Sequence, residues 1–197
     1  MSDTSVRNNR NFQINSVHHL ITKGNNQDIF LDDRDFNRYI FSLRKFSKRL
    51  SVRILAFCLM PNHVHILARQ DSEISLSKFM QTLSTAYANY FNTRYKRQGH
   101  LFEARFKNIE VTTDEYLIHL SRYIHLNPSS SQIVQSPQHY KWGSYKHYLG
   151  HGSLDFIDER IILAYFSKDN PRRDYQEFVE SRIEYQKDIS LQKLLLE

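Results

Sequence analysis

The chain has 197 residues, of which 40% are hydrophobic and 13% aromatic, so it is long enough to bury one sizeable core. We expect no membrane segment and no secretory leader, because no run of about 18 apolar residues occurs and no signal peptide opens the chain, and the single cysteine, Cys58, excludes an internal disulfide or a cysteine metal cluster. The formal net charge is +6, and it is unevenly distributed: residues 1–150 carry 20 Lys or Arg against 11 Asp or Glu, a balance of +9, and residues 151–197 carry 7 against 10, a balance of −3. The basic part fits either a nucleic-acid partner or a mildly basic soluble protein.

The first half of the chain predicts a strand, a helix and two more strands. Apolar and polar side chains alternate in the first segment, and an apolar stripe at helical spacing marks the second, which Asp32 or Asp33 can cap. The third segment is nearly all apolar, as in a central strand covered on both faces, and Pro61–Asn62 turns the chain into the fourth. The predicted bounds are 12–23 for the first strand, about 33–50 for the helix, and 52–60 and 63–68 for the later strands.

The second half predicts a long helix that starts at Leu76 and ends in the basic segment 94–99, and then a short strand over 105–111. Thr112 and Glu115 have the spacing of a capping box for a third helix, which Asn127–Pro128 is expected to end at about residue 126. This order of elements implies an α+β sandwich with an antiparallel sheet. After residue 137 we expect short helices, the last an acidic amphipathic one over about 171–188, so that a helical extension (151–197) follows the main domain (1–150).

Two histidines one residue apart, His63 and His65, are the most informative feature of the chain. Side chains of a strand alternate between its faces, so both imidazoles project from one face while Val64 points into a core on the other. Two imidazoles on a rigid strand form half of a metal site. The same pattern is also typical of two polar side chains on a solvated face, so by itself it does not establish metal binding.

The third predicted helix supplies candidates for the other half of such a site. Tyr123 and Asn127 lie four residues apart, about 40° apart around the helix axis, at the margin of its apolar face. There a tyrosine hydroxyl can reach an opening, and an asparagine carbonyl can bind a metal. His119 lies one turn earlier, near the same edge. Taken singly, Tyr123 is more typical of a packed aromatic, Asn127 of a helix-ending turn, and His119 of a partly exposed helix position.

Together with the motifs around them, these residues resemble the HUH single-tyrosine transposases, and specifically the REP-associated tyrosine transposase branch. HUH denotes His, hydrophobic, His, which is His63–Val64–His65 here. The resemblance runs from about Ser16 to Gly150, and the ordered set of motifs is far more specific than HUH alone. The motifs are Ile21–Thr22–Lys23–Gly24–Asn25–Asn26, Cys58–Leu59–Met60–Pro61–Asn62–His63–Val64–His65, Gly99–His100–Leu101–Phe102, Arg105–Phe106–Lys107, Arg122–Tyr123–Ile124–His125–Leu126–Asn127–Pro128 and Trp142–Gly143–Ser144–Tyr145.

The resemblance implies a ferredoxin-like fold and an enzyme that cuts and rejoins single-stranded DNA. It implies Tyr123 as the nucleophile, which forms a 5′-phosphotyrosyl intermediate, and His63, His65 and Asn127 as ligands of Mg²⁺ or Mn²⁺. The expected partner is single-stranded DNA at hairpins or palindromic repeat ends, in the cytoplasm and at the nucleoid. His119 is a candidate accessory base, although the sequence does not identify the group that activates the tyrosine. The basic residues nearest to these motifs, and therefore expected to contact DNA, are Arg94, Lys96, Arg97, Arg105, Lys107 and Arg122. Surface salt bridging explains Arg105 and Arg122 equally well.

Two other functions stay open on the sequence alone. A domesticated DNA-hairpin-binding protein without transposition activity would keep the basic surface, although the intact set of four site residues argues against lost catalysis. A metallohydrolase that uses water as the nucleophile would not need Tyr123. We expect a monomer rather than a homodimer, because the C-terminal helices can block a dimer face, but the sequence does not decide whether the site is built within one chain or between two.

Overall fold

The computed structural model describes residues 12–185 and is built around a four-stranded antiparallel sheet in the order β2-β3-β1-β4. β3 pairs with β2 on one side and with β1 on the other, and β4 pairs with the outer side of β1. The strands are β1 (Val17–Lys23), β2 (Val52–Met60), β3 (His63–Gln70) and β4 (Lys107–Val111). The predicted α+β fold class with an antiparallel sheet is confirmed.

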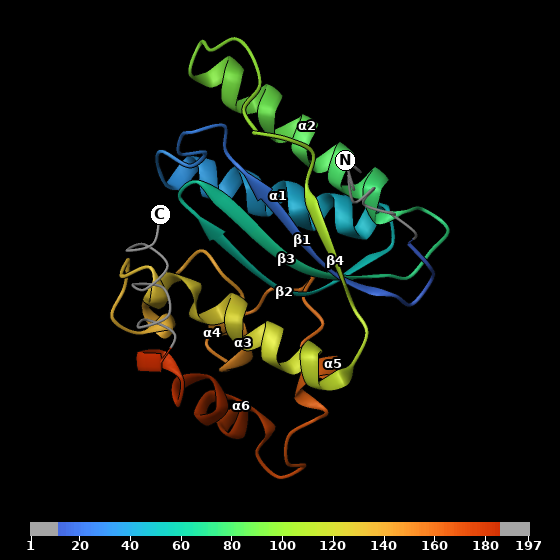
Figure 1. Ribbon diagram of the computed structural model, residues 1–197, viewed down its shortest axis with the longest axis vertical. Helices are drawn as coiled ribbons and strands as arrows, with labels where there is room; N and C mark the ends of the chain where they lie inside the picture. Colours follow the sequence, from blue (N-terminus) through green and yellow to red (C-terminus); the bar gives the residue numbers. More distant parts are fainter. Residues whose placement is uncertain (1–11, 186–197) are drawn as a thin grey trace, which may run out of the picture.

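Helices cover both faces of this sheet. Figure 1 shows α1 (Asp33–Arg49) and α2 (Leu76–Arg94) on one side, and α3 (Asp114–Ser130) with the C-terminal helices on the other. Of the two predicted caps for the first helix, Asp32 is the one used, because its side chain accepts hydrogen bonds from two backbone amides of the first turn. The later elements are η1 (Pro137–His139), α4 (Tyr145–Tyr148), α5 (Arg160–Leu163) and α6 (Pro171–Glu180). Between residues 12 and 185, no helix is both long enough and apolar enough to cross a membrane.

Four predicted boundaries in particular were wrong. β1 starts at Val17 rather than at residue 12, because Ser16 closes a turn onto the carbonyl of Gln13 with both its amide and its hydroxyl. α3 is capped by Thr113 instead of Thr112. It also continues through Pro128 to residue 130. The last predicted helix ends at residue 180 in α6, and positions 186–188 of that prediction lie outside the described residues.

Tertiary contacts explain why α3 does not stop before its proline. Residues 124–130 are all buried, so packing favours the helical conformation over the local preference of the residue before a proline. The carbonyl of Leu126 accepts hydrogen bonds from the hydroxyls of Ser129 and Ser130. Asn127 therefore sits inside a rigid helix rather than in a loop.

The chain that follows α3 runs along the outer edge of β2. The amide of Leu59 donates to the carbonyl of Trp142, and the amide of Ser144 donates to the carbonyl of Phe57. Further along, the amide of Asp158 donates to the carbonyl of Ile54. These bonds satisfy a strand edge that would otherwise expose unpaired backbone groups.

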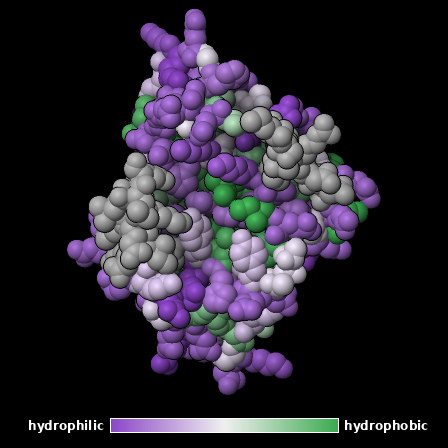
Figure 2. All heavy atoms as spheres, in the orientation of Figure 1, coloured by the Kyte–Doolittle hydropathy of each residue, from purple (hydrophilic) through white to green (hydrophobic). Residues whose placement is uncertain are grey.

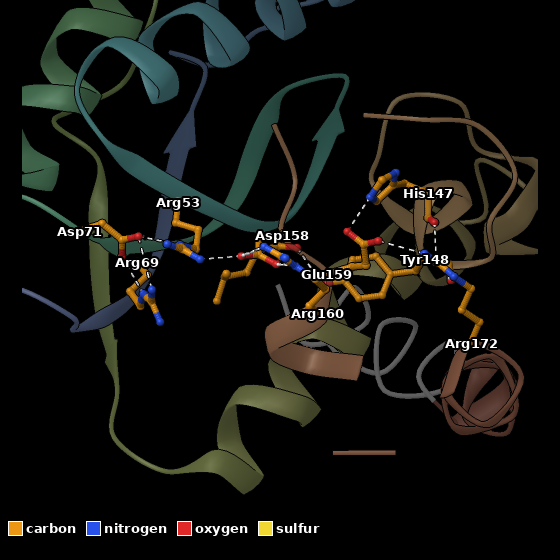
Figure 3. Close-up of polar contacts among 10 residues, drawn as sticks. Arg53, Arg69, Asp71, His147, Tyr148, Asp158, Glu159, Arg160 and Arg172 are labelled. Carbon is orange, nitrogen blue, oxygen red and sulfur yellow. Dashed lines mark hydrogen bonds and ion pairs between the residues drawn. The ribbon is translucent and has the colours of Figure 1, made fainter. Parts of the chain in front are cut away.

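Ion pairs secure this covering segment, as Figure 3 shows. Arg53 of β2 joins Asp71 and Asp158, each at 2.6 Å. Further along, the Glu159 carboxylate accepts a hydrogen bond from Arg172 and lies 2.8 Å from Nε2 of His147. The segment beyond residue 150 is thus bonded to residues before it, while the division into two domains stays a prediction.

A second ion-pair cluster ties the end of α2 to the start of α1. The guanidinium of Arg94 donates to Asp32 and to Asp35, whose side chain is fully buried. Asp35 also accepts from the hydroxyls of Tyr90 and Tyr95. Arg94 therefore stabilises the contact between α2 and α1. Because its guanidinium already has these partners, it is a weaker candidate for contacting DNA than its sequence position indicates.

We expect Arg94→Leu to destabilise the protein by about 3 kcal/mol, because it leaves a buried carboxylate without its cation. Lys96→Ala is the matched control, since Lys96 is an exposed residue two positions away and should change stability by less than about 0.5 kcal/mol. Denaturant unfolding followed by circular dichroism measures both. Equal, small effects of the two changes would contradict the structural role of Arg94.

Candidate functional site

His63 and His65 lie on one face of β3, as the spacing predicts. Their ring centroids are 4.8 Å apart, and the rings are perpendicular. Val64 between them is buried in the core on the opposite face. β3 is an inner strand paired on both sides, so the two imidazoles are held on a rigid support.

Both histidines have one ring nitrogen occupied and the other left without a partner in the described part of the chain. His63 donates from Nδ1 to Oδ1 of Asn62 at 2.7 Å, because that oxygen can only accept. Nδ1 of His65 lies 2.9 Å from Nε2 of His19, within hydrogen-bond distance. Nε2 of His65 is buried and has no hydrogen-bond partner among residues 12–185. A buried polar atom without a partner is costly unless something else binds it.

Burial keeps both imidazoles neutral. It lowers the pKa of His63 to about 4, with a smaller contribution from the charge of Lys23. It also lowers the pKa of His65 well below its usual value, helped by the neighbouring His63 and His19. A neutral imidazole has a free lone pair, and that is the form that binds metal ions.

α3 packs on the face of the sheet that carries these histidines and brings Tyr123 to them. The Tyr123 ring lies 5.7 Å from the ring of His65 and 6.4 Å from that of His19, edge-on to each. Its side chain is 41% exposed, and its hydroxyl makes no hydrogen bond to any residue in the described range. The phenol is therefore packed against the histidines while its oxygen stays accessible to a substrate.

Asn127 lies one turn further along α3 and is buried. Its amide nitrogen donates to the carbonyl of Tyr123 at 3.2 Å, so the amide oxygen is the atom available as a ligand. Residues 12–185 hold no group of three or more His, Cys, Asp or Glu side chains placed to bind an ion. An ion on the histidine pair thus needs a ligand of another kind, and an asparagine oxygen is one that Mg²⁺ and Mn²⁺ accept. The donor set fits the predicted metal.

His125 holds α3 in place from its other side. Nδ1 of this buried histidine is 2.7 Å from the hydroxyl of Tyr175 in α6, and Nε2 is 2.8 Å from the hydroxyl of Ser144. Ser144 in turn bonds the backbone of Phe57 in β2. Tyr175 also donates to Ser121, one turn before His125. This set of contacts, which we call the His125 clamp, links the helix that carries Tyr123 to β2 and to α6.

The structure does not gather the remaining predicted residues around the histidine pair. His119 bonds Arg122 at 2.8 Å, and both side chains pack on the ring of Phe178 in α6. Arg97 donates to Asn92 and lies over the ring of Phe91. The predicted DNA-contacting residues that remain exposed are Lys96, Arg105 and Lys107.

Arg105 lines an open groove of about 930 Å³ between α2 and residues 99–106. Polar side chains of α2, among them Gln81, Asn89 and Asn92, form much of its wall, and Lys78 lines it as well. The lining residues do not include His63, His65 or Tyr123, so the groove is separate from the histidine pair. The face drawn in Figure 2 is largely hydrophilic, with a small group of hydrophobic side chains near its centre.

Sequence reasoning missed His19, Asn62 and His125 as parts of the site. Strand alternation indicates that His18 and His19 face opposite sides, but only the register of β1 on β3 places His19 beside His65. Asn62 is expected as a turn residue and as part of a family motif, and its contact with His63 is not predicted. His125 belongs to the family motif around Tyr123, but its contacts are not predictable from the sequence, because its partners Tyr175 and Ser144 come from distant segments.

Comparisons with known proteins match this chain to a family model and to solved structures. The family model described as IS200-like transposase matches residues 13–127. A solved structure of a REP-associated tyrosine transposase bound to a REP hairpin superposes with a TM-score of 0.63, at 12% sequence identity, over 80% of this chain and 98% of that one. The structure of a candidate transposase from Deinococcus radiodurans is 18% identical, with a TM-score of 0.43 over 58% of this chain and 92% of that one. The comparison with curated proteins finds no match.

We expect the metal-free protein to lose stability as the pH falls below about 6.5. Burial lowers the pKa of His125 to about 3, so between that value and its usual 6.5 only the unfolded state takes up this proton. Stability from this group is complete above pH 6.5 and decreases by about 1.4 kcal/mol for each pH unit below it. Urea unfolding in EDTA at several pH values tests this. A profile for His125→Gln as steep as that of the unmodified protein would contradict it.

Proposed function

The chain belongs to the IS200-like transposase family, and we propose that it is a metal-dependent enzyme that cuts and transfers single-stranded DNA. The observation that carries this proposal is the position of Tyr123, whose ring lies 5.7 Å from that of His65 within one chain. An accessible phenol beside two neutral imidazoles is an arrangement suited to phosphoryl transfer through a tyrosine.

The residues that would hold the divalent ion are His63 and His65, each through Nε2, and Asn127 through its amide oxygen. The unpartnered Nε2 of His65 and the Asn62 contact that leaves Nε2 of His63 free support this set. When bound, Mg²⁺ or Mn²⁺ would supply a Lewis acid that offsets the negative charge developing on the scissile phosphate.

Tyr123 acts as the nucleophile. Its oxygen loses a proton and bonds to phosphorus, the bond from phosphorus to the 3′ oxygen of the preceding nucleotide breaks, and that oxygen takes up a proton. The product is a 5′-phosphotyrosyl linkage with a free 3′-hydroxyl. Because the linkage keeps the phosphodiester energy, a second 3′-hydroxyl can reverse the step and join strands. His119 stays a candidate proton acceptor on sequence grounds, although its contacts are with Arg122 and with Phe178 of α6.

Single-stranded DNA with a hairpin is the proposed substrate. The structurally similar transposase is bound to a REP hairpin, and this chain carries exposed cations at Lys96, Arg105 and Lys107. The groove beside Arg105 offers amide and hydroxyl groups of α2 to an unpaired strand. The two halves of the site come from the same chain, which supports a monomer with a site of its own.

The proposal predicts a covalent protein–DNA adduct that depends on Tyr123. The protein is incubated with Mn²⁺ and single-stranded hairpin DNA labelled at either end, and the products are separated under denaturing conditions. We expect an adduct that retains the label on the 3′ side of the cut. Tyr123→Phe should abolish the adduct and leave hairpin binding unchanged. Tyr116→Phe, another partly exposed tyrosine of α3, is the matched control and should react normally.

Two results would overturn the proposal in different ways. Tight hairpin binding without cleavage, across hairpins of several sequences, would favour a DNA-binding protein without transposition activity. Cleavage that survives Tyr123→Phe, with no adduct, would instead indicate a metallohydrolase that uses water.

A further inference from the structure

We propose that His19 is a positioning residue that fixes the tautomer and orientation of His65. It accepts a hydrogen bond from Nδ1–H of His65 and so leaves the lone pair of His65 on Nε2, where the divalent ion binds. This inference rests on the proposed function, because it assigns His19 a role toward that ion.

The contact between the two histidines is short and shielded from water. Nε2 of His19 lies 2.9 Å from Nδ1 of His65, and the rings stack at 5.0 Å with an angle of 26° between their planes. Only 3% of His19 and 4% of His65 is exposed. In the sheet, His19 stands opposite Leu67, which places it diagonally from His65 on the same face. Two paired strands thus hold both rings.

One proton is shared between the two nitrogens, and its position decides what His65 can bind. If His19 donated, the neutral His65 would carry its own proton on Nε2, and that buried N–H would have no acceptor among residues 12–185. Buried N–H groups without partners are rare because they are costly. If His65 donates from Nδ1, Nε2 becomes a lone pair aimed at the site. The second arrangement is therefore favoured, and a cation on Nε2 stabilises it further.

The other histidine of the pair is held in the same manner. His63 donates from Nδ1 to Asn62, which also leaves its Nε2 free. Each proposed ligand thus has its own hydrogen-bond partner behind it, an arrangement that usually orients metal-binding imidazoles. His19 does not qualify as a third ligand, because the described residues hold no cluster of three such side chains placed to bind one ion.

Mn²⁺ affinity, measured by electron paramagnetic resonance of the free ion, tests this role without using activity. We expect His19→Leu to weaken binding by about 10- to 100-fold, the usual effect of losing such a partner. His19→Gln should retain affinity within a few-fold, because its amide oxygen can still accept from Nδ1–H. His18→Leu is the matched control, since this equally buried neighbour bonds Ser16 instead and should leave affinity unchanged.

The outcomes separate this inference from the proposed function. An unmodified protein that binds no Mn²⁺ at millimolar concentration would overturn the metal-dependent function itself. An unmodified protein that binds Mn²⁺, with His19→Leu binding equally well, would overturn only the role of His19. If the variants do not fold, nitrogen NMR of the unmodified protein decides. We expect the Nδ1–H tautomer at His65 with a coupling across the hydrogen bond to His19, and the Nε2–H tautomer would contradict the inference.

Discussion

The packing of α3 against the sheet is the interaction on which the candidate site depends. Tyr123 and Asn127 belong to this helix, whereas the histidines belong to β3, so a site exists only while the two stay in register. The His125 clamp provides this register, because one buried imidazole bonds both Ser144, which is anchored to β2, and Tyr175 of α6. The C-terminal helices thereby support the site from the side of α3 that faces away from the histidines.

On the side of α3 that faces the histidines, burial has a chemical effect. It disfavours the charged form of His63 and His65, so both are neutral and can donate lone pairs at neutral pH. Tyr123, by contrast, keeps its hydroxyl at the surface while its ring covers the pair. The fold therefore places the shielded imidazoles next to an accessible phenol.

Periodicity along the chain predicts the parts of this arrangement that depend on local geometry. Alternation on one strand places His63 and His65 together, and helical spacing places Tyr123 near Asn127. The contact between His19 and His65 is not predictable in this way, because it depends on the register of strands 46 residues apart. The same limit applies to Arg94, which looks like a surface cation until its partner Asp35 on α1 is known. It also applies to the end of α3, because burial of its last residues outweighs the effect of Pro128.

Anomalous scattering from a crystal soaked in Mn²⁺ would show whether β3 and α3 together hold a metal ion, because it locates the ion and its ligands in one experiment. We expect one strong peak within ligand distance of Nε2 of His63, Nε2 of His65 and the amide oxygen of Asn127, with the Tyr123 hydroxyl facing it. A peak bonded to His19, or no peak at the histidine pair at saturating Mn²⁺, would contradict it.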